Sequence, residues 1–195
     1  MKNLIFLILI FFVHSALLCD WKLQKSSPHY KAYTKDGEGK EYRVEAVIRA
    51  SADSVYKFLT GFEKFPEYYD NISSIKIIDS NDSSAYHYTV INTPWPLKDR
   101  DMVTKIIISK NKDKITLNSR SVTDPEFPES DKLIRVNGFK EQLEIEVSGN
   151  NKTVLKITGS MKITEKVPSW VIDKLILTGP VKTVEILEKL YGIGE

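Results

Sequence analysis

A succession of short strand-like segments constrains the fold of this chain more than any other feature of its sequence. Turn-forming clusters such as Ser80-Asn81-Asp82-Ser83 separate one segment from the next. In the last segment, Leu155 and Ile157 alternate with Lys156 and Thr158. This alternation predicts an antiparallel sheet with one face exposed to water. The segments are Ile75–Ile78, Ala85–Asn92, Met102–Ser109, Ile115–Ser121, Lys132–Val136, Glu141–Val147 and Thr153–Ile163.

Helical patterns flank the strand-rich region on both sides. Ser51 is a typical N-cap, and Val55 and Phe58 follow it at helical spacing. After Pro168, which suits the first turn of a helix, apolar residues recur in three- and four-residue steps to the end of the chain. Gly179-Pro180 is expected to kink or split that terminal helix.

Together these elements predict one domain of the α+β class. A curved antiparallel sheet that wraps around the long C-terminal helix would hide the apolar stripe of the helix and leave a cavity between them. The same pattern also permits a solidly packed α+β sandwich. The chain has 195 residues and no internal repeat, which fits a single domain.

The first nineteen residues differ in character from the rest. Lys2 precedes an unbroken apolar run from Leu4 to Val13, and the chain becomes polar at Asp20. This order is typical of a secretory signal, and the run is too short to cross a membrane comfortably. We therefore expect a signal peptide at 1–19, a domain at 20–195, and export to the periplasm or the exterior.

The segment Ala16-Leu17-Leu18-Cys19 also resembles a bacterial lipoprotein box, from which it departs at Leu18. Membrane anchoring through Cys19 is therefore the alternative to a free exported protein. Cys19 is the only cysteine of the chain, so the domain that follows has no disulfide, thiol nucleophile or cysteine metal ligand.

The composition excludes several other classes of protein. Lys and Arg number 28 against 26 Asp and Glu, so no excess of positive charge favours nucleic acid. The domain has two histidines, His29 and His87, and neither has a metal-ligand partner at a suitable spacing. His87 is expected to be exposed or hydrogen-bonded. No nucleophile-elbow, P-loop or dinucleotide motif occurs, so we expect no catalytic residue, metal or cofactor.

Several motifs, taken in order, resemble the StAR-related lipid-transfer (START) domain family. Pro94-Trp95-Pro96 precedes Arg100-Asp101 at the opening of a strand, Phe65-Pro66-Glu67-Tyr68-Tyr69 forms a proline–aromatic segment, and Arg135 lies on a middle strand. Val167-Pro168-Ser169-Trp170 resembles the family's entry to the last helix. The resemblance extends from Tyr30 to Leu190.

The resemblance implies a helix-grip fold that holds one sterol, phospholipid or other hydrophobic molecule in an apolar tunnel without catalysis. We also expect a monomer that makes transient contact with membranes. Arg100 and Arg135 lie among apolar strand residues and need a carboxylate or a ligand oxygen; Asp99 and Asp101 are nearby candidates for Arg100. The expected ligand-binding residues are Tyr88, Trp95, Arg100, Arg135, Trp170, Leu177 and Val181.

Two other functions remain open at the level of sequence. An enzyme on a related helix-grip scaffold, such as a cyclase or hydratase, would use Tyr88, Arg100 and Arg135 as its polar groups. A structural envelope protein would have a solid core. The alternative to a ligand contact for Pro94-Trp95-Pro96 is a structural corner of the backbone, which the fixed backbone direction of proline favours.

Overall fold

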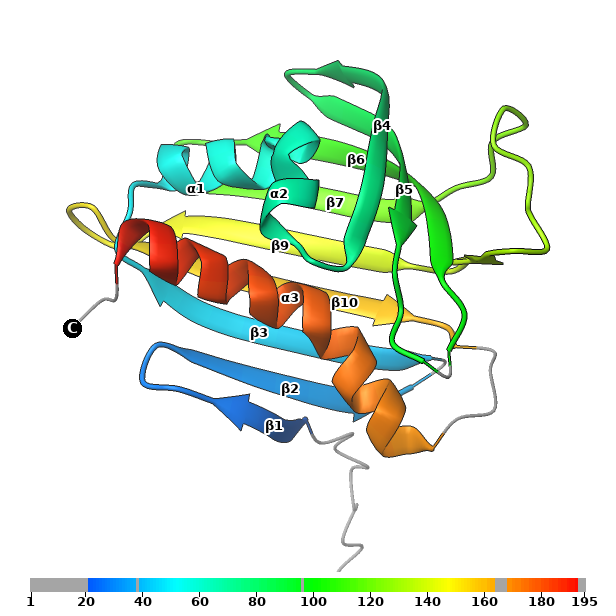
Figure 1. Ribbon diagram of the computed structural model, residues 1–195. Helices are drawn as coiled ribbons and strands as arrows, with labels where there is room; N and C mark the ends of the chain where they lie inside the picture. The colour runs from blue at the N-terminus through cyan, green and yellow to red at the C-terminus, as the bar shows by residue number, and fades with distance from the viewer. Residues whose placement is uncertain (1–20, 38, 96, 164–167, 193–195) are drawn as a thin grey trace, which may run out of the picture.

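Ten strands form one strongly curved sheet in the computed structural model, which describes residues 21–37, 39–95, 97–163 and 168–192 (Figure 1). The expected signal peptide at 1–19 lies outside the described residues. The strands are β1 (Lys22–Ser26), β2 (Tyr30–Asp36), β3 (Lys40–Ile48), β4 (Ile72–Asn81), β5 (Ser84–Ile91), β6 (Arg100–Lys110), β7 (Lys114–Ser121), β8 (Ile134–Arg135), β9 (Lys140–Val147) and β10 (Thr153–Met161).

Nine of these strands follow the order β1-β2-β3-β10-β9-β7-β6-β5-β4, and every neighbouring pair is antiparallel. The predicted strand at Lys132–Val136 shortens to β8, which pairs parallel to the start of β6. Two backbone bonds hold it there, from Ile134 N to Asp99 O and from Val136 N to Asp101 O. The α+β prediction is confirmed, with β8 as the parallel exception.

The helices lie against the concave face of the sheet, called here the inner face (Figure 1). They are α1 (Ala52–Thr60), the 3₁₀ helix η1 (Phe62–Lys64), α2 (Phe65–Tyr68) and α3 (Ser169–Tyr191). As predicted, Ser51 caps α1, because its Oγ accepts a hydrogen bond from Ser54 N. The long helix α3 contacts β3 and β2, whereas α1 contacts β9.

The helix α3 runs without a break through Pro180, so of the two outcomes expected there, a kink or a split, the split is wrong. Proline removes one backbone donor from the interior of the helix, yet neighbouring groups support the turn. Thr183 Oγ1 donates to Gly179 O at 3.0 Å and lies 2.8 Å from the hydroxyl of Tyr69. None of the described helices has the length and apolar character needed to cross a membrane.

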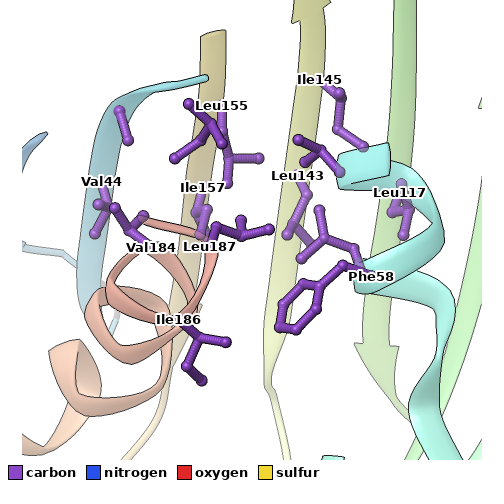
Figure 2. Close-up of a cluster of buried hydrophobic side chains, with 14 of the residues drawn as sticks. Val44, Phe58, Leu117, Leu143, Ile145, Leu155, Ile157, Val184, Ile186 and Leu187 are labelled. Carbon is purple, nitrogen blue, oxygen red and sulfur yellow. The ribbon is translucent and has the colours of Figure 1, made fainter. Parts of the chain in front are cut away.

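Apolar side chains on the inner face form the core (Figure 2). Val44 on β3 and Leu155 on β10 are fully buried, and Val184 and Leu187 of α3 pack against this part of the sheet. Phe58 brings α1 into the same cluster farther along the sheet. The alternation seen in the sequence thus separates a buried inner face from a largely polar outer face.

Candidate functional site

A cavity of about 640 Å³ lies between the inner face of the sheet, the helix α3 and the segment η1–α2. Its volume is in the range of small-molecule sites in proteins. Most of its wall is apolar or aromatic, and the residues that contribute to the wall include Leu59, Phe62, Phe65, Leu117, Leu143 and Ile157. Such a wall favours a hydrophobic ligand, because water gains few hydrogen bonds from it.

The lining also contains polar side chains, and five of them form a band across the sheet, which we call the polar row: Tyr42, Glu141, Ser119, Thr104 and His87. Strand pairing sets their order. Glu141 on β9 is the register partner of Ser119 on β7. Thr104 on β6 is the register partner of His87 on β5. Ile106, two residues after Thr104 on β6, is the partner of Ser119.

Tyr42 reaches Glu141 from two strands away, across a glycine. Tyr42 on β3 pairs with Gly159 on β10, and Gly159 in turn pairs with Glu141. The Tyr42 hydroxyl donates to Glu141 Oε2 at 2.7 Å. A Cβ atom at position 159 would lie 2.3 Å from that hydroxyl oxygen, so only glycine leaves room for the contact.

Burial shapes the acid–base behaviour of this pair. It raises the pKa of the Glu141 carboxyl above its usual value, and the hydrogen bond from Tyr42 opposes the shift. Burial, together with the nearby Glu141 charge, raises the pKa of Tyr42 well above its usual value. Both groups therefore favour their uncharged forms more than they would in water.

His87 and Thr104 at the other end of the polar row are buried without a full set of partners. Their exposed fractions are 7% and 2%, and neither His87 Nδ1 nor Thr104 Oγ1 has a hydrogen-bond partner among the described residues. The expectation of an exposed or fully hydrogen-bonded His87 is therefore wrong. The ring lies against Phe62, with centroids 5.0 Å apart, and burial lowers the pKa of His87 to about 4.

Three of the expected ligand-binding residues line the cavity. Arg100 is buried and donates from Nη1 to Thr93 Oγ1 and Lys98 O, both at 3.0 Å. Trp95, in the loop between β5 and β6, and Trp170, at the start of α3, also belong to the lining. These two tryptophans are 91% and 69% exposed, so they mark the cavity's opening to solvent.

The other expected residues lie outside the cavity lining. Arg135 forms a two-bond ion pair with Asp101, from Nε to Oδ1 at 2.9 Å and from Nη2 to Oδ2 at 2.8 Å. Tyr88 also donates to Asp101, at 3.0 Å, and stacks on Phe127. This cluster lies on the outer face, because Tyr88 has the opposite strand parity to His87.

Leu177 and Val181 are each 7% exposed and belong to the hydrophobic core. They are not among the residues that line the cavity.

Sequence reasoning missed Tyr42, Thr104, Ser119 and Glu141 as residues of the cavity. The sequence did contain a signal for Glu141. It lies on the same face of the strand as Leu143 and Ile145, which are both buried, and the neighbouring position 142 is exposed. The described residues contain no group of three or more His, Cys, Asp or Glu side chains placed to hold a metal ion.

The burial of His87 predicts a pH-dependent stability. Its pKa is about 4 in the folded chain and 6.5 in the unfolded chain, so the unfolded state binds more protons between these values. The free energy of unfolding should therefore fall by about 3 kcal/mol as the pH drops through this window. Urea unfolding at several pH values should show a smaller fall for His87→Gln. Identical pH profiles for the two proteins would contradict the prediction.

Comparisons with known proteins agree with the fold. The START domain model matches residues 19–190. A STAR-related lipid transfer protein from Xanthomonas axonopodis has a solved structure that superposes with a TM-score of 0.76 at 25% identity, covering 88% of this chain and 98% of that one. A sequence relative, an uncharacterized protein from Pseudomonas aeruginosa, is 22% identical over 174 residues, 88% of this chain and 86% of its own length.

The phosphatidylcholine transfer protein of Mus musculus is also similar, with 25% identity over 142 residues. These residues make up 68% of this chain and 64% of the mouse protein. The family model covers most of the chain, and the predicted helix-grip architecture, a curved sheet around a C-terminal helix, is present. This chain therefore belongs to the START domain family.

Proposed function

We propose that this protein binds one lipid molecule in the cavity between the sheet and α3, and that it carries the lipid without changing it chemically. The observation that supports this most directly is the cavity of about 640 Å³ with its mainly apolar wall. Membership of the START family and similarity to named lipid transfer proteins agree with it. A single chain forms this cavity, so lipid binding requires no second subunit.

Catalysis on an apolar substrate is the second candidate, favoured by the shifted pKa values of His87 and Glu141 in one cavity. Shifted values of this kind often mark active sites. However, the two residues lie on β5 and β9, with β6 and β7 between them. Three strand spacings separate their backbones by about 14 Å along the sheet, which is unsuitable for an acid and a base that act on the same bond. Binding is therefore the better-supported function.

The opening of the cavity suits contact with a membrane surface. Trp95 and Trp170 are largely exposed and border the same cavity, and tryptophan side chains favour the interface between water and lipid. Contact there would bring the opening next to the bilayer, so that a lipid could enter without crossing water. We therefore include transfer between membranes in the proposal.

Filling the cavity should abolish lipid binding. Ile106 lines the cavity from β6, so Ile106→Trp should weaken binding of a fluorescent phospholipid or sterol by roughly tenfold or more. Ile107→Trp is the matched control, because Ile107 is 48% exposed on the opposite face of the same strand. Both variants should keep a cooperative thermal transition, and Ile106→Phe offers a smaller change if the first variant unfolds. Equal affinity of the Ile106 and Ile107 variants for the lipid would refute the cavity as the binding site.

Removing the exposed tryptophans should slow transfer without preventing binding. We expect Trp95→Ala and Trp170→Ala each to reduce the rate of lipid transfer between vesicles by about tenfold, since a buried large apolar side chain contributes about 1.5 kcal/mol or more. Leu23→Ala is the control, because Leu23 is 55% exposed on the edge strand β1. Transfer rates that respond equally to all three changes would argue against a membrane contact at the opening.

We further propose that residues 1–19 direct export, based on the apolar run from Leu4 to Val13. Mass spectrometry of the protein from its native host should find a mature chain that begins near residue 20. If Cys19 is acylated, that chain will begin at Cys19, carry a lipid mass, and leave the membrane fraction after Cys19→Ser. A chain that retains Met1 through Val13 would contradict export.

A further inference from the structure

We propose that a hollow on the outer face of the sheet, lined by Lys105 and Arg120, binds a phosphate group. The hollow has a volume of about 390 Å³ and is lined by residues of β4, β5, β6 and β7. It is separate from the lipid cavity, because Thr104 and Ile106, on either side of Lys105 in β6, line that cavity on the opposite face. Inorganic phosphate, a soluble phosphate ester and a lipid head group are alternative sources of the same chemistry.

Strand pairing places three basic side chains side by side on the outer face, and we call them the basic row. Lys105 on β6 is the register partner of Arg120 on β7, and Arg120 is the partner of Lys140 on β9. All three residues are exposed. Directly opposed residues have Cβ atoms about 5 Å apart, and like charges in such positions destabilise a sheet. The stability of the fold therefore does not explain the basic row.

Elsewhere on the outer face, lysines pair with carboxylates. Lys114 contacts Glu144 and also lies 3.1 Å from Glu146 Oε1. Lys35 Nζ lies 2.9 Å from Glu41 Oε2. By contrast, no member of the basic row forms an ion pair or a side-chain hydrogen bond within the residues that the structure describes. The basic row therefore presents its charge to an anion from outside the chain.

The carboxylates near the hollow do not neutralise this charge. Asp79 lines the hollow from β4, and β5 separates it from Lys105, which is a distance of about 10 Å across two strand spacings. Asp124 follows the lining residues of the loop after β7 and already accepts two hydrogen bonds. Tyr86 donates to its Oδ2 at 2.5 Å, and Glu126 N donates to its Oδ1 at 2.8 Å.

The loop that forms one wall of the hollow is held in place by bonds to the sheet and within the loop. Val122 and Thr123 line the hollow just after β7, and Val122 N donates to Val103 O at 2.9 Å. Farther along the loop, Arg135 Nη2 donates to Phe127 O at 3.0 Å. A wall that is already ordered reduces the entropy lost when a ligand binds.

A phosphate group fits the hollow better than a carboxylate. A phosphate monoester carries a charge of about −1.5 to −2 at pH 7, which matches two adjacent cations. The guanidinium of Arg120 can donate two parallel bonds to phosphate oxygens, and the ammonium of Lys105 can donate another. Ser84 and Thr123 also line the hollow, and their hydroxyls can donate to a remaining oxygen. A carboxylate has two oxygens and a single charge, so it would leave some of these donors unused.

The experiment compares phosphate with a singly charged anion, and soluble ligands with a membrane. The purified full chain is titrated at constant ionic strength with inorganic phosphate, glycerol 3-phosphate and acetate. Its binding to phosphatidylcholine vesicles is measured with and without phosphatidic acid. We expect saturable binding of a phosphate source with a dissociation constant of about 1 mM or below, and at least about tenfold weaker binding of acetate. The source whose binding depends on Lys105 and Arg120 identifies the natural form of the ligand.

Variants assign the binding to the basic row. Lys105→Gln and Arg120→Gln should each weaken phosphate binding by about tenfold or more, because each removes charge-assisted hydrogen bonds. Lys112→Gln and Arg49→Gln are the matched controls and should leave the affinity unchanged, since both residues are exposed and lie outside the hollow.

Thermal unfolding provides a second measurement, in which the two effects of one substitution have opposite signs. Without ligand, the Lys105→Gln protein should melt at the same temperature as the wild type or higher, because the substitution relieves a contact between like charges. Added phosphate should raise the melting temperature of the wild type more than that of the variant. A Lys105→Gln protein that is less stable than the wild type and gains as much from phosphate would contradict the proposal.

Other results would also overturn it. Equal weakening by all four glutamine substitutions, acetate binding as tight as phosphate binding, or no saturable binding of any phosphate source would exclude a phosphate site in the hollow. The proposal does not depend on lipid binding, so the Ile106→Trp protein should bind phosphate as the wild type does. Phosphate affinity that falls with Ile106→Trp and not with Arg120→Gln would place the anion in the lipid cavity instead.

Discussion

A single helix of 23 residues cannot cover a curved sheet of ten strands, and most of this structure follows from that mismatch. The helix α3 packs on β3 and β2, and α1 packs on β9. The inner face between them and η1–α2 remains partly uncovered, and this uncovered part is the cavity. Val184 and Leu187 anchor α3 to the sheet in Figure 2, so the packing that stabilises the fold also forms one wall of the cavity.

The same sheet places a small number of polar groups where an apolar core would normally continue. Burying these groups costs free energy unless they form hydrogen bonds, and only some of their polar atoms do so. Tyr42 and Glu141 satisfy one another across Gly159, whereas His87 and Thr104 retain unpaired atoms. Apolar residues in place of His87 and Thr104 would be expected in a domain selected only for stability. The presence of these two polar residues beside an apolar cavity therefore agrees with ligand recognition.

Much of the fold could be predicted, because strands and helices leave local signatures. The alternation of Leu155 and Ile157 with polar residues located β10, and Ser51 located the start of α1. The errors arose where distant contacts outweigh local preference. Tertiary packing keeps α3 continuous through Pro180, and the bonds to Asp99 and Asp101 make β8 short and parallel. The site was harder to predict, because Tyr88 lies on the more apolar face of β5, yet that face is the outer one, whereas the polar His87 and Thr89 face the cavity.

The sequence alone determined the class of fold, the family resemblance and the likeness of residues 1–19 to an export signal, because each depends on residues that are close together in the chain. Only the tertiary structure decided which polar residues face the cavity. The polar row joins residues 42, 87, 104, 119 and 141, which lie far apart in sequence. The register of six strands, β3, β10, β9, β7, β6 and β5, and the absence of a side chain at Gly159 place them in one row. Register is a property of paired backbones, which no single segment of the sequence specifies.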